Sequence, residues 1–264
     1  MTLTAISLRR VTAVAGRNVG ALRSGPQYWA AVLSGVFEPL MYMLAIGGGV
    51  GSLMVSRWAV DGHEVPYLTY VAPGVLASAA MSGAIAETVI HFFFKLRYQK
   101  TFEGMSATPV RPVEIVLGEL GWAVTRSAAY VAVFLMIMAG MAVTTPVRAA
   151  VTLPAGILVA LAFAALGMCV STLLRGWQDL DLVIVAQLAL FLFSGTFAPV
   201  DDYPGPLRAV VEALPLYHGV ELTRGLAVGG GSAMALAGHA LYLSLLTAVS
   251  VALAAVRMRR MLQP

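Results

Sequence analysis

Six long runs of apolar residues, separated by polar connections, limit most strongly how this chain can fold. They cover residues 28–55, 67–90, 115–143, 149–174, 182–198 and 233–256. Each is about long enough to cross the ~30 Å of hydrocarbon in a bilayer at about 1.5 Å of helix per residue. Hydrocarbon has no partner for an open strand edge, so only helices or closed barrels span it. Barrel strands alternate apolar and polar residues, whereas these runs are continuously apolar, which predicts six transmembrane helices.

The composition agrees with a membrane location. Hydrophobic residues make up 59% of the 264 residues and charged residues only 11%, whereas soluble domains carry about 25% charged residues. A soluble chain of this length cannot bury so much apolar surface in one core. The sequence therefore predicts an all-α membrane protein.

The distribution of basic residues predicts how these helices are oriented. If the N-terminus is cytoplasmic, twelve Lys and Arg residues fall on the inner side, four on the outer side and Arg126 within a span. Cytoplasmic connections carry an excess of Lys and Arg, so both termini are expected in the cytoplasm. Topology and contact with anionic lipid headgroups explain the net charge of +4, and no nucleic acid partner is expected. The richness in Arg, Ala and Gly indicates a GC-rich bacterial genome, and hence a multi-pass protein of a bacterial cell membrane.

The segment before the first run mixes apolar and basic residues. In residues 5–23, apolar side chains recur at helical spacing with arginines between them, which predicts an amphipathic helix on the membrane surface. We therefore expect a single transmembrane domain over residues 1–264. It would comprise an interfacial helix (1–27), six spans (28–256) and a cytoplasmic tail (257–264).

Two connections are too long to be simple turns. The inner one, residues 91–114, is rich in aromatic and basic residues. The outer one, residues 199–232, contains two apolar stretches that prolines and a glycine run interrupt. Each stretch is too short to span a bilayer, which predicts two short outer helices before the sixth span.

Motifs for chemistry within the chain are missing. A phosphate-binding loop needs a lysine that follows a glycine, but Lys95 and Lys100, the only lysines, follow Phe94 and Gln99. The four histidines are scattered and form no zinc-binding pair. We expect no catalytic residues, no ATPase site, and no metal or other cofactor in this chain.

An ordered series of short motifs runs along the chain. It comprises Tyr-Val-Ala-Pro-Gly at 70–74, Tyr-Gln-Lys-Thr at 98–101, Ala-Thr-Pro-Val at 107–110, Leu-Gly-Glu-Leu at 117–120, Phe-Ser-Gly-Thr-Phe-Ala-Pro-Val at 193–200 and Leu-Pro-Leu at 214–216. In this series the sequence resembles the ABC-2 type permeases of nodulation-factor and daunorubicin exporters. The resemblance begins near residue 36 and reaches the last span, and such an ordered series is far more specific than any one motif.

The resemblance implies a fold and a set of partners. Such permeases have six helices, a cytoplasmic coupling helix after the second span and two short outer helices before the sixth. They act as dimers with two copies of a separate ATPase, which binds the ATP and Mg²⁺. A homodimer and a heterodimer both remain open. The contact with the ATPase would fall on a segment after the second span: Arg97, Tyr98, Gln99, Lys100, Thr101 and Glu103.

These residues suit a docking role, because an aromatic anchor flanked by charges can fit a groove on a soluble partner. The alternative is a basic loop that serves topology alone. The other inner connection carries Arg175 and Asp179. It is either a second contact for the ATPase or a short turn.

Two charged residues lie deep within the predicted spans. Glu38 and Arg126 are each about ten residues from an inner end, roughly 15 Å deep, so they could pair. The pair would serve helix packing or line the translocation pathway. Glu87 and Glu119 lie closer to the inner face and are expected to reach water there.

The sequence thus predicts the permease subunit of an exporter that moves an amphipathic solute, either a lipid-linked saccharide or a hydrophobic drug. A secondary transporter or channel is the alternative, but it predicts intramembrane ionisable relays and internal repeats. An intramembrane transferase would need acidic or histidine clusters at one face, and Asp201 and Asp202 are the only adjacent acidic pair.

Overall fold

The computed structural model describes residues 7–24, 37, 40–45, 49, 58–60 and 63–262. Most of the first predicted span, including Glu38, lies outside these residues. The helices are α1 (Leu8–Ser24), α4 (Tyr67–Ile85), α5 (Phe92–Arg97), α6 (Thr101–Ser106), α7 (Pro112–Gly140), α8 (Pro146–Ser171), α9 (Gln178–Leu192), α10 (Gly205–Ala213), α11 (Pro215–Arg224) and α12 (Ala233–Leu262). The described part also contains two π-helical turns, η2 (Ala86–His91) and η4 (Gly225–Gly229), and a 3₁₀ turn, η3 (Val200–Asp202). Residues 40–44 are helical as well.

Four helices of the described residues are long and apolar enough to cross a membrane. They are the continuous helix Tyr67–Arg97, which joins α4, η2 and α5, and the helices α7, α8 and α12. They coincide with the second, third, fourth and sixth predicted runs. The prediction of an all-helical membrane protein is confirmed to this extent, and the count of six spans stays a prediction.

The fifth predicted run forms a shorter helix than expected. The helix α9 has 15 residues, about 22 Å at 1.5 Å per residue, and it ends at Leu192 instead of Ala198. Beyond it the chain turns at Gly195, where φ is +72°, and the Ser194 and Thr196 hydroxyls lie 2.8 Å apart. Arg224 of α11 donates to the Gly195 carbonyl at 2.7 Å. Protein groups therefore bind the polar backbone of this turn.

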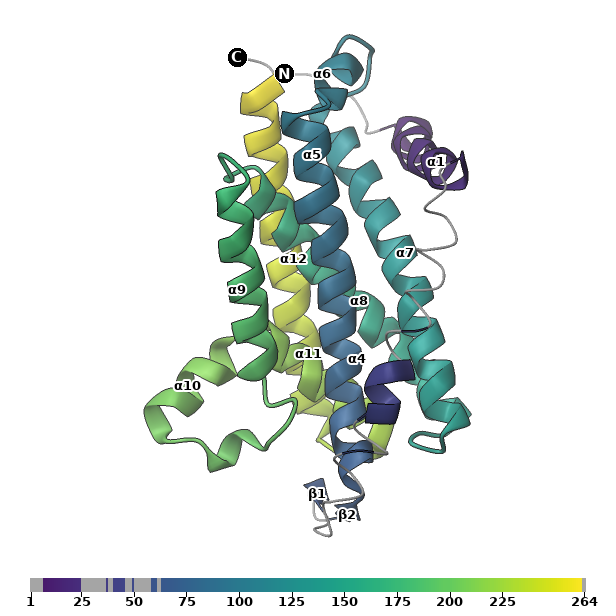
Figure 1. Cartoon of the computed structure of the whole chain (residues 1–264), viewed down its shortest axis with the longest axis vertical. Coiled ribbons are helices and arrows are strands. Elements are labelled where there is room, and N and C mark those ends of the chain that lie inside the picture. Colours follow the sequence, from purple (N-terminus) through teal and green to yellow (C-terminus); the bar gives the residue numbers. More distant parts are fainter. Residues whose placement is uncertain are drawn as a thin grey trace.

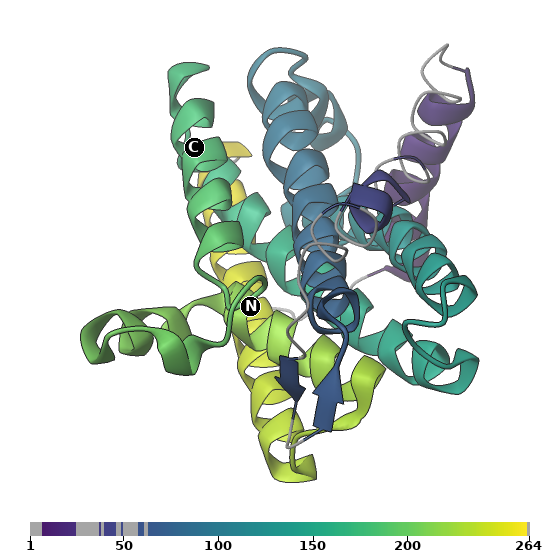
Figure 2. The same ribbon diagram turned by 60° about the horizontal axis from the view of Figure 1, so that its bottom comes forward.

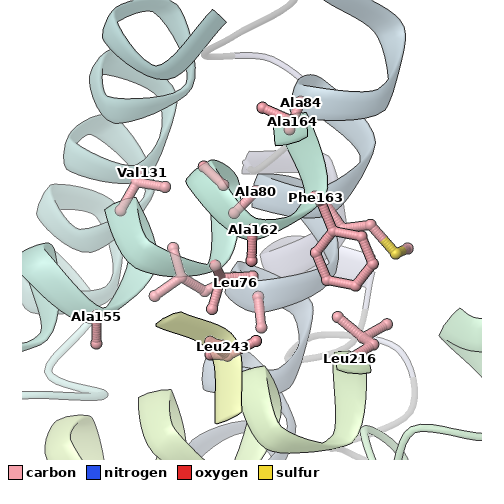
Figure 3. Packing of buried hydrophobic residues seen from close by; sticks show 14 of the residues in the cluster. Leu76, Ala80, Ala84, Val131, Ala155, Ala162, Phe163, Ala164, Leu216 and Leu243 are labelled. Carbon is pink, nitrogen blue, oxygen red and sulfur yellow. The ribbon is translucent and has the colours of Figure 1, made fainter. Parts of the chain in front are cut away.

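The helix α8 lies at the centre of the bundle and packs against α4, α7 and α12. Several of its buried positions are small, as in Ala155, Ala162 and Ala164. In Figure 3, Ala162 lies near Leu76 and Ala80 of α4, and Ala164 lies near Ala84. Small side chains let helix backbones approach closely, which is how helices associate where surrounding lipid is as apolar as the side chains.

A close approach between α8 and α7 carries a testable prediction. A Cβ atom on Gly156 of α8 would lie 2.6 Å from Cγ1 of Val131 on α7. Gly156→Ala is therefore expected to lower the free energy of unfolding by about 1–3 kcal/mol through overpacking, with a lower thermal midpoint in detergent. Adding Val131→Ala should relieve part of this loss. Gly238→Ala is the control, since no described atom lies within 4 Å of that site; equal effects of the two glycine variants would contradict the prediction.

Proline and capping residues fix where the long helices start. Pro112 occupies the first turn of α7, and the Glu114 carboxylate accepts a hydrogen bond from the Arg111 backbone N–H at 2.9 Å. Pro146 begins α8 after Thr145, whose hydroxyl accepts from the Arg148 N–H at 3.3 Å. Both arrangements are typical of helix N-termini, where proline loses no hydrogen bond.

The connections separate into two ends of the bundle. The helix α6 and the end of α12 lie together at one end, with α1 beside them, whereas α10 and the β-strands lie at the other (Figure 1). The α7–α8 connection also belongs to the second end, because the Thr144 hydroxyl donates to the Ala227 carbonyl of η4 at 2.6 Å. This separation is the one expected from the predicted topology. Which end faces the cytoplasm stays a prediction.

A small β-hairpin precedes α4 and was not expected. The strands β1 (Trp58–Val60) and β2 (His63–Val65) pair antiparallel, with Trp58 opposite Val65 and Val60 opposite His63 (Figure 2). The dipeptide between them in the sequence is Asp-Gly, the strongest short-range hairpin signal. The long apolar runs on either side of this dipeptide do not by themselves indicate a hairpin.

Candidate functional site

The segment after the second predicted span forms a helical end, a tight turn and a short helix. The α4–η2–α5 helix ends at Arg97, and α6 follows from Thr101. Lys100, between them, adopts the left-handed conformation with φ of 48°. The buried rings of Phe92 and Phe102 lie 4.9 Å apart between centroids, so α6 is held against the end of the long helix.

Most of the predicted coupling residues lie on the surface of this segment. Arg97, Tyr98, Gln99, Lys100 and Glu103 are exposed, and Thr101 is partly buried. Tyr98 is 52% exposed, although Phe93 packs against its ring on one side, with ring centroids 5.9 Å apart. The segment thus offers an aromatic side chain with charged residues on both sides.

The connection between α8 and α9, which carries Arg175 and Asp179, packs against this segment. The Trp177 ring lies 4.8 Å from the ring centroid of Phe94 and 6.1 Å from that of Tyr98. Arg97 Nη2 donates to the Leu174 carbonyl at 3.1 Å. The two connections, 77 residues apart, therefore form one surface. We call Phe94, Arg97, Tyr98, Arg175 and Trp177 the Tyr98–Trp177 surface.

Trp177 was not among the residues expected in the site, and it is 53% exposed. Its position is fixed by Asp179, whose Oδ2 accepts from the backbone N–H of Arg175 at 2.6 Å and of Gly176 at 3.3 Å. Asp179 thus shapes the turn that starts α9, and Arg175 is exposed beside Trp177. The sequence signal for this contact residue was a tryptophan within a short, charged connection.

The helix α1 packs against α7, close to this end of the bundle. Val14 is buried against Gly118, where a Cβ atom would lie 2.6 Å from the valine Cβ. Lys95 Nζ donates to Asn18 Oδ1 at 2.9 Å and to Glu119 Oε2 at 2.7 Å. The expectation that Glu119 reaches water is wrong, because Glu119 is only 4% exposed and is bound by Lys95. The same lysine links α1 to the helix that ends in the coupling residues.

A second cluster of charged residues lies between η2 and α7. Glu87 forms an ion pair with Arg126 and accepts from Trp122 Nε1 at 3.2 Å. Arg126 Nε also donates to the Tyr130 hydroxyl at 2.9 Å, and His91 Nδ1 lies 3.4 Å from the Glu87 carboxylate. The π-helical turn Ala86–His91 carries both Glu87 and His91, and such turns frequently occur at functional sites.

This cluster changes the expectation for two charged residues. Glu87 does not reach water but is 8% exposed and paired. Arg126 was expected to pair with Glu38, which lies outside the described residues, and the structure gives it Glu87 as a partner. The two residues are 39 positions apart and on different helices, so helical spacing within one run could not reveal the pair. The pairing of Glu38 with Arg126 stays a prediction.

Within the described ranges, no group of three or more His, Cys, Asp or Glu residues is placed to hold a metal ion.

Comparison with known proteins identifies the family. The model of the ABC-2 type transporter family matches residues 16–228, from α1 to η4. The chain belongs to the ABC-2 type transporter family. It is similar to nodulation protein J of Rhizobium meliloti (strain 1021), with 34% identity over 76% of this chain and 75% of that protein. It is also similar to nodulation protein J of Rhizobium leguminosarum bv. trifolii, with 33% identity over 82% of this chain and 87% of that protein.

Family membership gives the surface and the cluster their context. The chain is a bacterial-type, multi-pass ABC-2 permease, a transport subunit without an ATPase domain. ABC-2 permeases pair with separate ATPase subunits, which bind the nucleotide. An ABC-2 permease therefore needs a surface at one end of its helices to which the soluble ATPase can bind.

Proposed function

We propose that this ABC-2 permease exports an amphipathic solute and that its ATPase docks on the Tyr98–Trp177 surface. The observation that carries this proposal is the meeting of two separate connections in one exposed aromatic surface at the end of a spanning helix. Arg97, Lys100, Glu103 and Arg175 would orient the partner, because charges at an interface contribute more to orientation and on-rate than to affinity. Gln99, Thr101 and Asp179 would support the shape of this surface.

The continuous helix supports a mechanical connection from this surface to the core. Residues Tyr67–Arg97 form one helix of 31 residues, so a push on the turn at Tyr98 would move α4 against α8. The contact of Phe92 with Phe102 makes α6 move with it. ATP-driven closure of the ATPase would in this way move the spans as rigid bodies and change how they pack. No chemical step in this chain would be needed.

A second permease copy would complete the pathway. The helix α9 exposes a row of large apolar side chains in the single chain: Leu182, Ile184, Val185, Leu188 and Leu192. A second copy, identical or homologous, or lipid would cover this row. Spans with few charges suit a solute with a large apolar part, and a lipid-linked saccharide or a hydrophobic drug fits that description. The excess of inner Lys and Arg supports cytoplasmic termini.

Reconstitution with and without the ATPase tests this function. Because the chain has no phosphate-binding loop, the purified permease alone is expected to show no vanadate-sensitive ATP hydrolysis above background. With its ATPase in inside-out vesicles, it should accumulate an acylated saccharide or a hydrophobic drug in an ATP-dependent manner. Hydrolysis by the clean permease alone would contradict the transport assignment. Uptake that needs an ion gradient instead of ATP would identify a secondary transporter.

A further inference from the structure

A polar cavity lies at the end of the bundle opposite the Tyr98–Trp177 surface. It has a volume of about 290 Å³ and is lined by residues of η3, α10, α11 and the start of α12, with Tyr70 of α4 and Gly225 of η4. Small-molecule sites have volumes of roughly 300–1,000 Å³, so this cavity has room for about one ring-sized solute. In Figure 1, α10 projects sideways from the bundle at this end, and its residues Arg208 and Glu212 line the cavity.

One wall of the cavity carries a chain of paired charges. Arg208 of α10 lies between two carboxylates, with Nη1 2.7 Å from Asp201 Oδ1 and Nε 2.7 Å from Glu212 Oε1. The hydrogen bond from Arg208 to Glu212 raises the pKa of the guanidinium further, with Asp201 adding to the effect, so this arginine stays charged and held. All three side chains are exposed to the cavity side and to solvent.

The opposite wall supplies a phenol and a second ion pair. Arg224 binds Glu221 at 2.5 Å and is otherwise occupied by backbone carbonyls. Burial, and then the nearby carboxylates of Glu221 and Glu212, raise the pKa of Tyr217 to about 12. The Tyr217 hydroxyl therefore keeps its proton at any physiological pH and can donate a hydrogen bond. His239 of α12 completes this side.

The charges on these walls select against strongly charged ligands. Three carboxylates and two guanidinium groups line the cavity, and both arginines are already bound to carboxylates. An anion would meet no free cation and would face a net negative wall. A cation would be attracted only by the one carboxylate that the two arginines leave uncompensated, and that charge is shared among three paired side chains. A neutral ligand with many hydroxyls suits these walls best, because each hydroxyl donates one hydrogen bond and accepts others.

We propose that this cavity binds one neutral sugar ring. Carboxylates at Asp201 and Glu212 would accept from sugar hydroxyls, Arg208 and Tyr217 would donate to them, and the tyrosine ring would cover an apolar face. The inference that the ring belongs to the exported solute rests on the proposed function, in which this end of the bundle is the outer one. It selects the lipid-linked saccharide over the hydrophobic drug.

Binding can be measured without transport. The permease would be purified in a polyoxyethylene detergent, because detergents with sugar headgroups would compete, and placed in phosphatidylcholine nanodiscs. Saturation-transfer NMR would then compare methyl glucoside and methyl N-acetylglucosaminide with glucosamine and glucose 6-phosphate. We expect saturation of the two neutral rings. Binding of only the cationic or only the phosphorylated sugar would overturn the assignment.

Matched variants locate the signal. Asp201→Asn and Glu212→Gln should each weaken binding of the neutral rings about tenfold, the loss expected when a hydrogen bond to a charged group is weakened. Asp202→Asn is the control, because Asp202 follows Asp201 in the sequence and is exposed but does not line the cavity. Exposed ion pairs contribute little to stability, so these variants should fold. Equal binding in all four proteins, or no saturation of any sugar, would overturn the proposal.

Transport separates this inference from the proposed function. If neutral sugars bind through Asp201 and Glu212 but vesicles with the ATPase export nothing, the export assignment fails and the site remains. If ATP-dependent export proceeds equally with Asp201→Asn and Glu212→Gln and no sugar binds, the cavity proposal fails and the export assignment remains.

Discussion

Truncation of either Tyr98 or Trp177 to alanine is expected to weaken binding of the ATPase by at least about 2 kcal/mol, roughly 30-fold in Kd, because aromatic anchors at interface centres commonly cost that much. Both side chains are about half exposed in the single chain, at 52% and 53%, so each has surface left for a partner. The measurement is co-purification of the ATPase from detergent extracts, together with transport per ATP hydrolysed.

The double variant tests whether the two side chains act as one surface. Their ring centroids lie 6.1 Å apart, a separation at which aromatic pairs interact by about 0.5–1.5 kcal/mol. The losses in the double variant should therefore differ from the sum by a similar coupling energy. Additive losses would indicate two independent contacts.

Controls distinguish docking from insertion. Leu173→Ala removes a side chain of the same connection that is 53% exposed and lies outside the defined surface, so assembly should be unchanged. The spans determine membrane insertion, hence none of these variants should change insertion. Glu103→Arg should slow association more than it weakens the complex. Normal assembly and transport in both Tyr98→Ala and Glu103→Arg would contradict the docking proposal. The segment would then serve only to set the membrane topology.

The parts of the fold that were predictable depend on local composition. An apolar run of spanning length has one stable form in a bilayer, so the helices near 67–97, 112–140, 146–171 and 233–262 followed from the sequence. The short helices α10 and α11 followed from apolar stretches that proline and glycine interrupt. A short helix, α6, also lies after the second predicted span, where the resemblance implies a coupling helix.

The parts that were missed depend on contacts between distant residues. Glu87 meets Arg126 across 39 positions, and Trp177 meets Tyr98 across 79 positions; no periodicity within one run records either contact. The end of α9 was placed too late because Phe193 and Ala198 are apolar, whereas Gly195 and the bonds from Arg224 decide the turn. Packing of α1 through Val14 and Asn18 was likewise invisible in its amphipathic pattern.

Replacement of Glu87 by glutamine is expected to lower the free energy of unfolding by about 3–5 kcal/mol, because removing one partner leaves the other charge buried without compensation. Glu87 is 8% exposed, and the side chain of Arg126 is 22% exposed. The hydrogen bond from Trp122 would persist with an amide, but no negative charge would remain beside the guanidinium among the described residues. The measurement is the thermal midpoint of the purified permease and the fraction that stays monodisperse in detergent.

The same pair predicts its own rescue. Glu87→Gln with Arg126→Gln removes both charges, so the double variant should be more stable than either single variant. Arg208→Gln is the control for charge alone: its ion pairs with Asp201 and Glu212 are exposed, and its loss should cost less than about 1 kcal/mol. Glu38→Gln tests the pairing expected from sequence; a loss equal to that of Glu87→Gln would make both carboxylates partners of Arg126. If Glu87→Gln is as stable as Arg208→Gln, the pair does not hold α7 against the long helix.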